Sequence, residues 1–315
     1  MNRRYTIRNQ MLQFLDYLAV LRPTLLFPVW TLVLLGYHHG STMPEAPTPS
    51  QPIRLWATLC LYTLLIGAVY IVNQITDRET DAANNKLYLV AQGYVKLKVL
   101  KWQIGVLITL SILLSLLVFP NNLTYLTLIS LSIILGFAYS VRPFRLKGKP
   151  ILDLCANALG YGGLAFLVGW GLLAPIDTEA IWRSLPYLFC VAAAFVNTTL
   201  PDLAGDKRGG DYTTGVWLGT KWACRLSLVL LLVAIGSAIF FKDWIAGTAS
   251  IVCLPIFIYI NFRPKQSVII WGTRIGILTL SLCASLLFPL YLLWFVLILL
   301  SVRWYYRARF NIRYP

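Results

Sequence analysis

Residues 55–81 read LWATLCLYTLLIGAVYIVNQITDRETD, an apolar run that ends in polar and acidic side chains. An apolar run of about 20 residues is the length that an α-helix needs to cross the hydrocarbon core of a bilayer. Ionisable side chains at membrane depth are costly, so they tend to persist where they serve a site. The stretch therefore predicts a transmembrane helix whose end carries functional polar groups.

Apolar runs of this kind recur along the whole 315-residue chain. Hydrophobic residues make up 58% of it and charged residues only 12%, where a soluble domain has about 25% charged residues. No polar stretch is long enough for a separate soluble domain, so we expect one transmembrane domain over residues 1–315. The first apolar segment is long and no cleavage site follows it, so we expect it to be a retained helix.

Hydropathy predicts an all-α membrane protein, a bundle of nine or ten transmembrane helices. The predicted helices cover residues 12–36, 53–76, 99–118, 123–141, 151–174, 181–200, 220–241, 244–262, 266–285 and 290–304. The last two could form one broken helix. Ten is favoured by the tail RWYYRARFNIRYP (303–315), because an odd number would place its four arginines outside the cell.

The net charge of +15 comes from basic residues at the amino terminus, in every second connection between helices, and in the tail. Near the other helix ends only Arg54, Arg183 and Lys242 occur. This bias predicts an integral protein of the cell (inner) membrane, with the amino terminus and the basic connections in the cytoplasm. Topology, anionic membrane lipids and phosphate ligands account for the charge, so nucleic acid is not expected as a partner.

Cysteine and histidine give no metal or disulfide pattern. The six cysteines are scattered singly without a CxxC pair, which argues against a zinc site and a disulfide framework. His38 and His39 are adjacent in a predicted short connection, where we expect a solvated loop tip.

Six of the twelve acidic residues lie in two short segments: Asp77, Glu79, Asp81, Asp202, Asp206 and Asp211. In the first segment Asn73, Asp77 and Asp81 are spaced by four residues, which keeps them within about 80° of one helix face. In the second, TLPDLAGD (199–206), the two aspartates repeat this spacing. Thr198 stands where the first segment has Asn73, and Asn197 is next to it.

Both acidic segments end an even-numbered predicted helix, so they lie on the same side of the membrane and are expected to face one another. Oxygen ligands without histidine or cysteine suit magnesium, which binds together with substrate phosphates. Two carboxylate sets with a basic rim therefore predict a magnesium and diphosphate site. The alternative is that these acids cap helices or lie on solvated helix ends. Two matched copies in a chain so poor in acids favour the site.

The residues NxxxDxxxD from Asn73, DxxGDxxxGxxT from Asp202 to Thr213, and YSVRPFRLKGKP (139–150) together resemble the UbiA superfamily of intramembrane prenyltransferases. The resemblance covers nearly the whole chain. It implies a helical bundle around a central cavity, with the two aspartate-rich motifs at its cytoplasmic mouth. It also implies a polyprenyl diphosphate bound through Mg2+ as cofactor, and an apolar tunnel for the prenyl tail.

The resemblance carries over residue by residue. The matches to the two motifs imply catalytic carboxylates and metal ligands: Asn73, Asp77, Asp81, Asp202 and Asp206. Other residues are implied to bind substrate: Arg22, Lys86, Tyr139, Arg145, Lys147, Asn197, Thr198 and Lys207. Arg22 is expected to reach the diphosphate, unless it extends to the membrane interface. Arg145 and Lys147 line the rim or simply belong to the positive-inside charge, and Tyr139 faces an allylic cation or lies in an interface belt.

One segment departs from the family pattern. After the first motif the family commonly has an Arg-Pro pair, whereas this chain has NNKLYLVAQGY (84–94), with Tyr88 and Leu89 in that place. Lys86 is the nearest cation, so donor binding is expected to differ here.

The leading hypothesis is transfer of a polyprenyl group from its diphosphate to a lipophilic acceptor. The acceptor could be a quinone precursor, an aromatic acid, a tetrapyrrole or a prenylated glycerol phosphate, and the divergent first loop favours the last. A membrane terpene cyclase is the alternative enzyme. A lipid transporter is disfavoured, because the acids gather at one membrane face and no broken helix pair marks a central site.

Overall fold

The computed structural model describes residues 12–44, 46, 52–83, 88–120, 122–312 and 314, and the regular structure of these residues is entirely helical. Ten helices among them are long and apolar enough to cross a membrane. They are Leu12–Ser41, Ile53–Thr76, Leu97–Val118, Leu123–Ser140, Leu152–Trp170, Thr178–Gly209, Thr214–Phe240, Trp244–Phe262, Gln266–Leu287 and Pro289–Phe310. This confirms the predicted all-α membrane class and decides for ten helices over nine.

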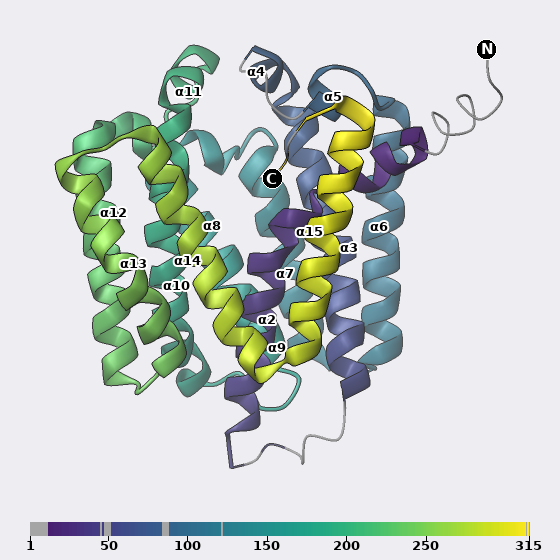
Figure 1. Ribbon diagram of the computed structural model, residues 1–315. Coiled ribbons are helices and arrows are strands. Elements are labelled where there is room, and N and C mark those ends of the chain that lie inside the picture. The colour runs from purple at the N-terminus through teal and green to yellow at the C-terminus, as the bar shows by residue number, and fades with distance from the viewer. Residues whose placement is uncertain are drawn as a thin grey trace.

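The helices form an up-and-down bundle (Figure 1). The longer ones are α2 (Leu26–Ser41), α3 (Pro52–Thr76), α6 (Leu97–Val118), α7 (Leu123–Ser140), α10 (Thr178–Thr199), α12 (Thr214–Phe240), α13 (Trp244–Phe262), α14 (Gln266–Leu287) and α15 (Pro289–Phe310). The fifth span consists of α8 (Leu152–Asn157), the π-helical turn η3 (Ala158–Ala165) and α9 (Phe166–Trp170). α14 and α15 are separate helices, because Phe288 has non-helical backbone angles (φ −127°, ψ 78°) and Pro289 starts the next helix.

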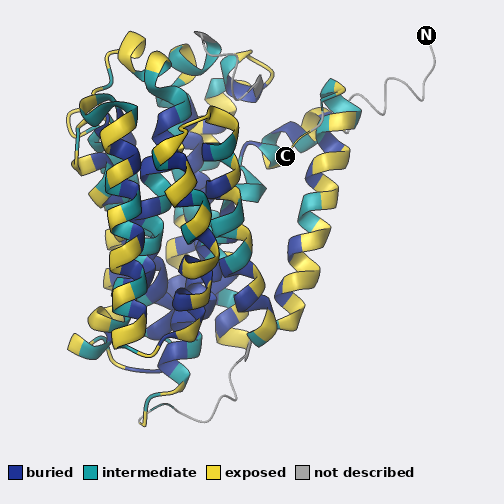
Figure 2. Cartoon of the chain, turned by 60° about the vertical axis from the view of Figure 1, so that its left-hand side comes forward, coloured by how far each residue is buried: buried dark blue, intermediate teal, exposed yellow. Residues whose placement is uncertain are grey.

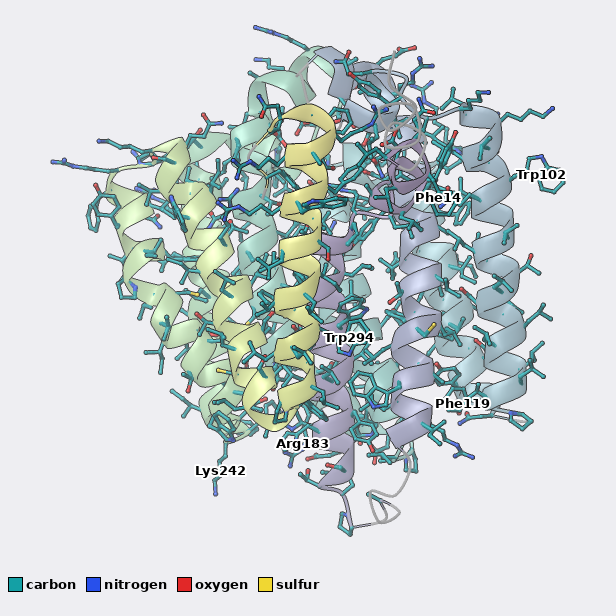
Figure 3. The ribbon with its side chains drawn as sticks, turned by 45° about the vertical axis from the view of Figure 1, so that its right-hand side comes forward. Phe14, Trp102, Phe119, Arg183, Lys242 and Trp294 are labelled. Carbon is teal, nitrogen blue, oxygen red and sulfur yellow. The ribbon has the colours of Figure 1, made fainter. Side chains whose placement is uncertain are left out.

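Three short helices lie beyond one end of the bundle, which we name the motif end (Figure 1). They are α4 (Arg78–Ala83), α5 (Tyr88–Ala91) and α11 (Leu203–Gly209). α4 and α11 directly follow the two acidic spans. Arg183 and Lys242 lie at the opposite end, which we name the far end (Figure 3).

α2 is the central helix of the bundle, and glycine allows its closest contact. A Cβ atom on Gly36 would lie 1.9 Å from the carbonyl oxygen of Phe166, and one on Gly169 would lie 1.9 Å from that of Val33. Membrane helices use small residues in this way, because they have no hydrophobic driving force toward one another and depend on close packing. The contact fixes α9 against α2.

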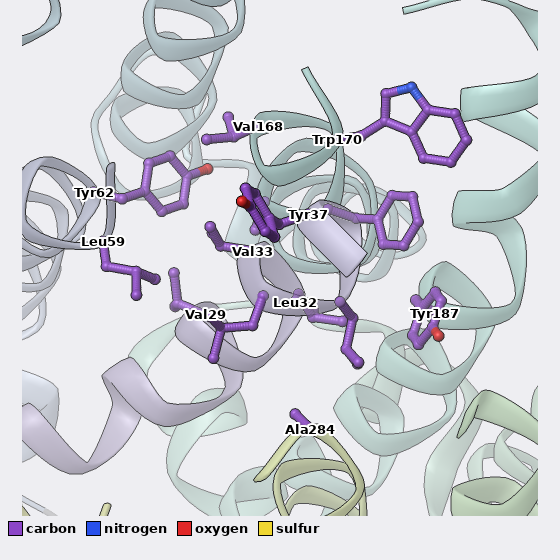
Figure 4. Close-up of a cluster of buried hydrophobic side chains, with 14 of the residues drawn as sticks. Val29, Leu32, Val33, Tyr37, Leu59, Tyr62, Val168, Trp170, Tyr187 and Ala284 are labelled. Atoms are coloured by element: carbon purple, nitrogen blue, oxygen red, sulfur yellow. The ribbon is translucent and has the colours of Figure 1, made fainter. Parts of the chain in front are cut away.

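Side chains from neighbouring helices pack around α2 (Figure 4). Val29, Leu32 and Val33 of α2 lie in one buried cluster with residues of α3, α9, α10 and α14. Among these are Leu59, Tyr62, Val168, Trp170, Tyr187 and Ala284. The outer faces carry the exposed residues (Figure 2), and on α6 these are apolar: Leu113, Leu116 and Leu117 are 49%, 48% and 76% exposed. Such a surface suits lipid and supports an integral membrane protein.

The first helical segment differs from its prediction at both its middle and its end. Residues 12–19 are helical, but the chain then turns, and Arg22 has left-handed backbone angles before the short helix η1 (Pro23–Leu25). Pro23 is the reason, because the residue before a proline is disfavoured in the right-handed helix. The helix resumes as α2 and runs to Ser41 instead of ending near residue 36.

The prediction that His38 and His39 lie in a solvated loop is wrong. Both belong to the last turn of α2, which extends this far because Gly36 and Gly40 fit against the backbone of Phe166 and Trp170. The His39 Nε2 atom is buried 3.2 Å from Oδ2 of Asp243 and 2.9 Å from the hydroxyl of Tyr187. This cluster joins three helices at the far end.

Candidate active site

The first acidic segment spans the junction of α3 and α4. Asp77 lies in a turn between the two helices, yet its N–H donates to the carbonyl of Asn73 (3.0 Å), and the N–H of Asp81 donates to the carbonyl of Asp77 (2.8 Å). The helical hydrogen-bond spacing therefore continues across the junction. Asn73, Asp77 and Asp81 keep the shared face that their spacing predicts. The side-chain amide of Asn73 donates to the hydroxyl of Ser140 on α7 (3.1 Å).

Two basic residues from the connection between α7 and α8 reach Asp77. The Lys147 Nζ atom lies 2.5 Å from Oδ1 of Asp77, and the Arg145 Nη2 atom lies 3.6 Å from the same oxygen. Lys147 also donates to the hydroxyl of Thr76 (3.0 Å). Burial lowers the pKa of Lys147, although the charge of Asp77 acts in the opposite direction. A largely buried lysine with a shifted pKa beside a half-buried carboxylate is the kind of charge pair that is found at functional sites.

The second acidic segment follows α10. Asp202 ends the short helix η4 (Leu200–Asp202), and Asp206 lies in the first turn of α11. The Thr213 hydroxyl donates to Oδ2 of Asp206 at 3.4 Å. A Cβ atom on Gly209 would lie 3.2 Å from the hydroxyl oxygen of Thr80, so α11 touches α4. The two acidic segments therefore meet at the motif end, as their places in the sequence predict.

Asp211 completes a charged chain across this end. Its two carboxylate oxygens accept hydrogen bonds from Nε and Nη2 of Arg145, both at 2.9 Å. Asp211 raises the pKa of Arg145 through these hydrogen bonds. Asp211 was not among the predicted site residues, although it is one of only twelve acids and follows Asp206 by five residues. That rarity is the signal by which it could have been found.

Asp153 is a second acid that the sequence reasoning missed. It is fully buried at the start of α8 and accepts hydrogen bonds from the backbone N–H (2.8 Å) and the hydroxyl of Thr214, the first residue of α12. The same hydroxyl lies 2.7 Å from the backbone nitrogen of Ile151. These contacts hold the basic connection between α7 and α8 against the segment that follows the second motif. A lone acid inside a predicted apolar helix was the available signal.

Arg22 lies deeper in the same half of the bundle. Its guanidinium carbon is 5.8 Å from the ring centre of Tyr70 on α3, which is seven residues before Asp77. The Tyr70 hydroxyl donates to the carbonyl of Leu25 (2.8 Å) and lies 2.7 Å from the hydroxyl of Tyr161 in η3. A small recess beside Arg22 is lined by residues of α3 and α15, among them Gln74 and Tyr306.

The other predicted residues have varied surroundings. Asn197 is 1% exposed, and neither atom of its side-chain amide has a hydrogen-bond partner. Thr198 is exposed, and its hydroxyl donates to the carbonyl of Phe195 in its own helix. Lys207 is exposed on α11, and Tyr139 is half-buried in the last turn of α7. Lys86 lies outside the described residues.

A cavity of about 570 Å³ opens at the motif end between the basic connection and the second motif. Its lining consists of Arg142, Pro143, Arg145, Gly148, Lys149, Gly209, Gly210 and Asp211. Three cations around one carboxylate suit an anionic ligand. Arg145 lines the cavity and also lies beside Asp77, so the cavity adjoins Asp77.

Magnesium fits this donor set only together with other ligands. Among the described residues, no three His, Cys, Asp or Glu side chains are grouped closely enough to hold a metal ion. The available donors are carboxylate and amide oxygens from two facing segments. Mg2+ normally keeps several water ligands and binds one or two carboxylates together with substrate phosphates. Carboxylate and amide oxygens therefore match its coordination preference.

The fold of this helical bundle matches solved structures of UbiA homologs. The solved structure of a UbiA homolog from Archaeoglobus fulgidus, bound to GPP and Mg2+, superposes with a TM-score of 0.66. It is 18% identical, and the match covers 86% of this chain and 98% of that one. Another UbiA homolog, from Aeropyrum pernix, gives a TM-score of 0.64 at 15% identity, covering 82% of this chain and 95% of that one.

The sequence assigns the family. Residues 25–267 match the model of the UbiA prenyltransferase family, so the chain belongs to this family. A bacteriochlorophyll synthase chain from Chloroflexus aurantiacus is 28% identical over 54% of this chain and 54% of its own length. A digeranylgeranylglyceryl phosphate synthase from Methanosphaera stadtmanae is 24% identical over 69% and 74%. The chain spans about half the length of the first curated relatives it matches.

Proposed function

We propose that this protein is a magnesium-dependent prenyltransferase that moves a polyprenyl group from its diphosphate to a lipophilic acceptor. One observation carries the proposal: Asp77 lies between Lys147 and Arg145, while α11 with the second acidic segment touches α4. The names of the relatives support it, because they describe prenyl, phytyl and digeranylgeranylglyceryl transfer or synthesis. The solved relative with GPP and Mg2+ supports the same ligands.

Five residues would hold the metal: Asn73, Asp77, Asp81, Asp202 and Asp206. When bound, Mg2+ neutralises charge on the diphosphate and makes it a better leaving group. Arg145 and Lys147 bind diphosphate oxygens from the side of the basic connection, and Arg22 binds from the bundle interior. Their positive charges stabilise the negative charge that develops on the leaving group.

The transfer breaks the bond between the prenyl C1 carbon and the diphosphate oxygen, and the electron pair leaves with the diphosphate. An acceptor atom forms the new bond to C1 and then loses its proton to water or a nearby base. In this proposal the Tyr139 ring would stabilise positive charge on the allylic carbon. Asn197, Thr198 and Lys207 would bind substrate from the second-motif side, where the unpaired amide of Asn197 would gain a polar partner.

The acceptor remains one of four classes: a quinone precursor, an aromatic acid, a tetrapyrrole or a prenylated glycerol phosphate. The names of three relatives point to tetrapyrrole, homogentisate and glyceryl phosphate acceptors. The prenyl tail would lie in an apolar tunnel within a central cavity of the bundle. The motif end faces the cytoplasm in this proposal, because the basic connections gather there.

The test uses the purified full chain in lipid nanodiscs with radiolabelled farnesyl and geranylgeranyl diphosphates. Each donor is incubated with one acceptor class at a time, with Mg2+ or with a chelator. The proposal expects a prenylated acceptor and released diphosphate only when donor, acceptor and Mg2+ are all present. Rapid release without acceptor, accompanied by a hydrocarbon product, would indicate a terpene cyclase instead. Intact donor under every condition would contradict both enzymes.

A further inference from the structure

Arg145 is fixed by Asp211 and not by Asp77. Its Nη2 atom lies 3.6 Å from Oδ1 of Asp77, which is too long for a hydrogen bond. The two bonds to Asp211 are 2.9 Å each and use Nε and Nη2 in parallel. Such paired charge-assisted bonds are stronger than single ones and define the plane of the guanidinium. The same nitrogen that Asp211 holds is therefore the one nearest to Asp77.

The backbone at this place is also held by the second-motif segment. Arg145 has φ 37° and ψ 57°, a left-handed conformation that is unfavourable for a residue with a side chain. The N–H of Tyr212 donates to the carbonyl of Gly148 (3.1 Å), three residues further along the connection. A Cβ atom on Gly148 would lie 2.6 Å from Oδ1 of Asp211, so glycine is required for the carboxylate to approach. The surrounding contacts thus impose the strained conformation on Arg145.

We propose that Asp211 is a positioning residue, which acts through Arg145 and orients its guanidinium for the diphosphate at Asp77. This rests on the proposed function of the site. Asp211 accepts two of the five N–H groups of the guanidinium, so three remain for phosphate oxygens. Asp211 also links the segment after the second motif to Arg145, the cation beside Asp77 of the first motif. Placement of Arg145 then depends on both halves of the site being folded together.

A purely structural role makes a different prediction. The Asp153–Thr214 contact joins the same two segments and does not involve Arg145. If Asp211 served only to join them, its loss would lower stability without a specific effect on the donor. If Asp211 positions Arg145, its loss raises the donor dissociation constant and the donor KM. In a variant that already lacks the Arg145 side chain, the loss of Asp211 changes neither quantity further.

The test is a double-mutant cycle on the full chain in nanodiscs with Mg2+. The variants are Asp211→Asn, Asp211→Glu, Arg145→Ala and Arg145→Ala/Asp211→Asn, and the exposed Glu79→Gln serves as the matched loss of a nearby carboxylate. Binding of an unreactive geranylgeranyl thiolodiphosphate is measured by calorimetry, together with donor KM, kcat and the melting temperature. We expect Asp211→Asn to weaken analogue binding and raise donor KM about tenfold, with a smaller change in kcat. Asp211→Glu should recover to within about threefold of wild type.

The double variant should bind within about twofold of Arg145→Ala alone. If the wild type binds the analogue, the diphosphate site is supported. Unchanged donor affinity in Asp211→Asn, or losses of affinity that multiply in the double variant, would then overturn the positioning role alone. A wild type that does not bind the analogue would overturn the proposed function and this inference with it. A melting temperature lowered without a change in donor affinity would assign Asp211 a structural role.

Discussion

At the scale of single residues, the carboxylates of the two motifs make the strongest prediction. Asp77→Asn and Asp202→Asn should each lower kcat by about 10³-fold, because each removes a charge that in the proposed site holds the metal and the leaving group. Folding should remain intact, since asparagine has nearly the same shape. Product formation by the purified variants is measured by thin-layer radiochromatography.

The exposed Glu79→Gln variant is the control for this experiment, since it removes a carboxylate from the same segment. It should retain wild-type turnover. Wild-type rates in either aspartate variant, or turnover that persists in chelator, would refute the metal site.

Arg22 combines a charge with a proposed role in diphosphate binding and a strained backbone, and two substitutions separate the two features. Arg22→Ala and Arg22→Gly both remove the guanidinium, but glycine alone tolerates φ 54° without cost. If the charge binds diphosphate, both variants raise the donor KM by about tenfold or more, because a charge-assisted hydrogen bond is worth roughly 1.5–3 kcal/mol. Steady-state kinetics at saturating acceptor measure the effect. A glycine variant with normal KM beside an impaired alanine variant would show that only the backbone matters.

The sequence predicted helical spacing in the candidate site better than contacts between distant segments. Spacing by four residues was enough to place Asn73, Asp77 and Asp81 on one face, because helical geometry determines it. Asp153 and Asp211 were missed because their partners lie 61 and 66 residues away, in segments that only the folded chain brings together. His39 was misplaced for a similar reason, since its burial depends on the Gly36 and Gly40 contacts with α9.

At the scale of helices, the contact between α2 and α9 depends on the absence of side chains. Gly169→Val should destabilise the protein by more than about 3 kcal/mol, because its Cβ would overlap a backbone oxygen that cannot move independently. Gly105→Ala on α6 is the control, since nothing lies within 4 Å of the added atom. Thermal unfolding in detergent, followed by size-exclusion chromatography, measures both. An unchanged melting temperature in Gly169→Val would refute the close contact.

The far-end cluster predicts a pH-dependent stability. Asp243 caps α13 by accepting from the N–H groups of Ile245 and Ala246. Burial acts to raise its pKa, but His39 and the Ala246 N–H outweigh burial, so the pKa is lowered. The ionised carboxylate therefore stabilises the fold above its unfolded pKa of about 3.9, and this contribution is lost as the pH falls through the lower folded value.

Asp243→Asn keeps the helix cap and removes the charge. It should lower the stability at neutral pH by roughly 1.5–3 kcal/mol, or the melting temperature by about 3–10 °C. The difference from wild type should shrink below about pH 4. Asp177→Asn, which removes the charge from the cap of α10, is the control. Equal melting curves of wild type and Asp243→Asn at neutral pH would contradict the cluster.

At the scale of the whole molecule, hydropathy predicted the ten spans, because burial in lipid imposes a nearly continuous apolar run of fixed length. It did not predict the turn at Arg22 or the π-helical turn in the fifth span. Both depend on local backbone chemistry and on neighbours that are distant in sequence. The central cavity stays a prediction, since the cavity described above lies at the motif end.

The orientation of the bundle can be tested by the chemistry of its two ends. The basic connections lie with α4 and α11, whereas Lys242 lies at the far end (Figure 3). Positive charge is retained in the cytoplasm, so a cysteine at Lys242 should react with a membrane-impermeant maleimide in intact cells, and a cysteine at Lys207 should not. In inside-out vesicles the cysteine at Lys207 should react and the cysteine at Lys242 should not. Both single substitutions are made in a background without the native cysteines, because Cys60 and Cys155 are exposed. Labelling of Lys207→Cys in intact cells would contradict the proposed orientation and would place the proposed diphosphate site outside the cell.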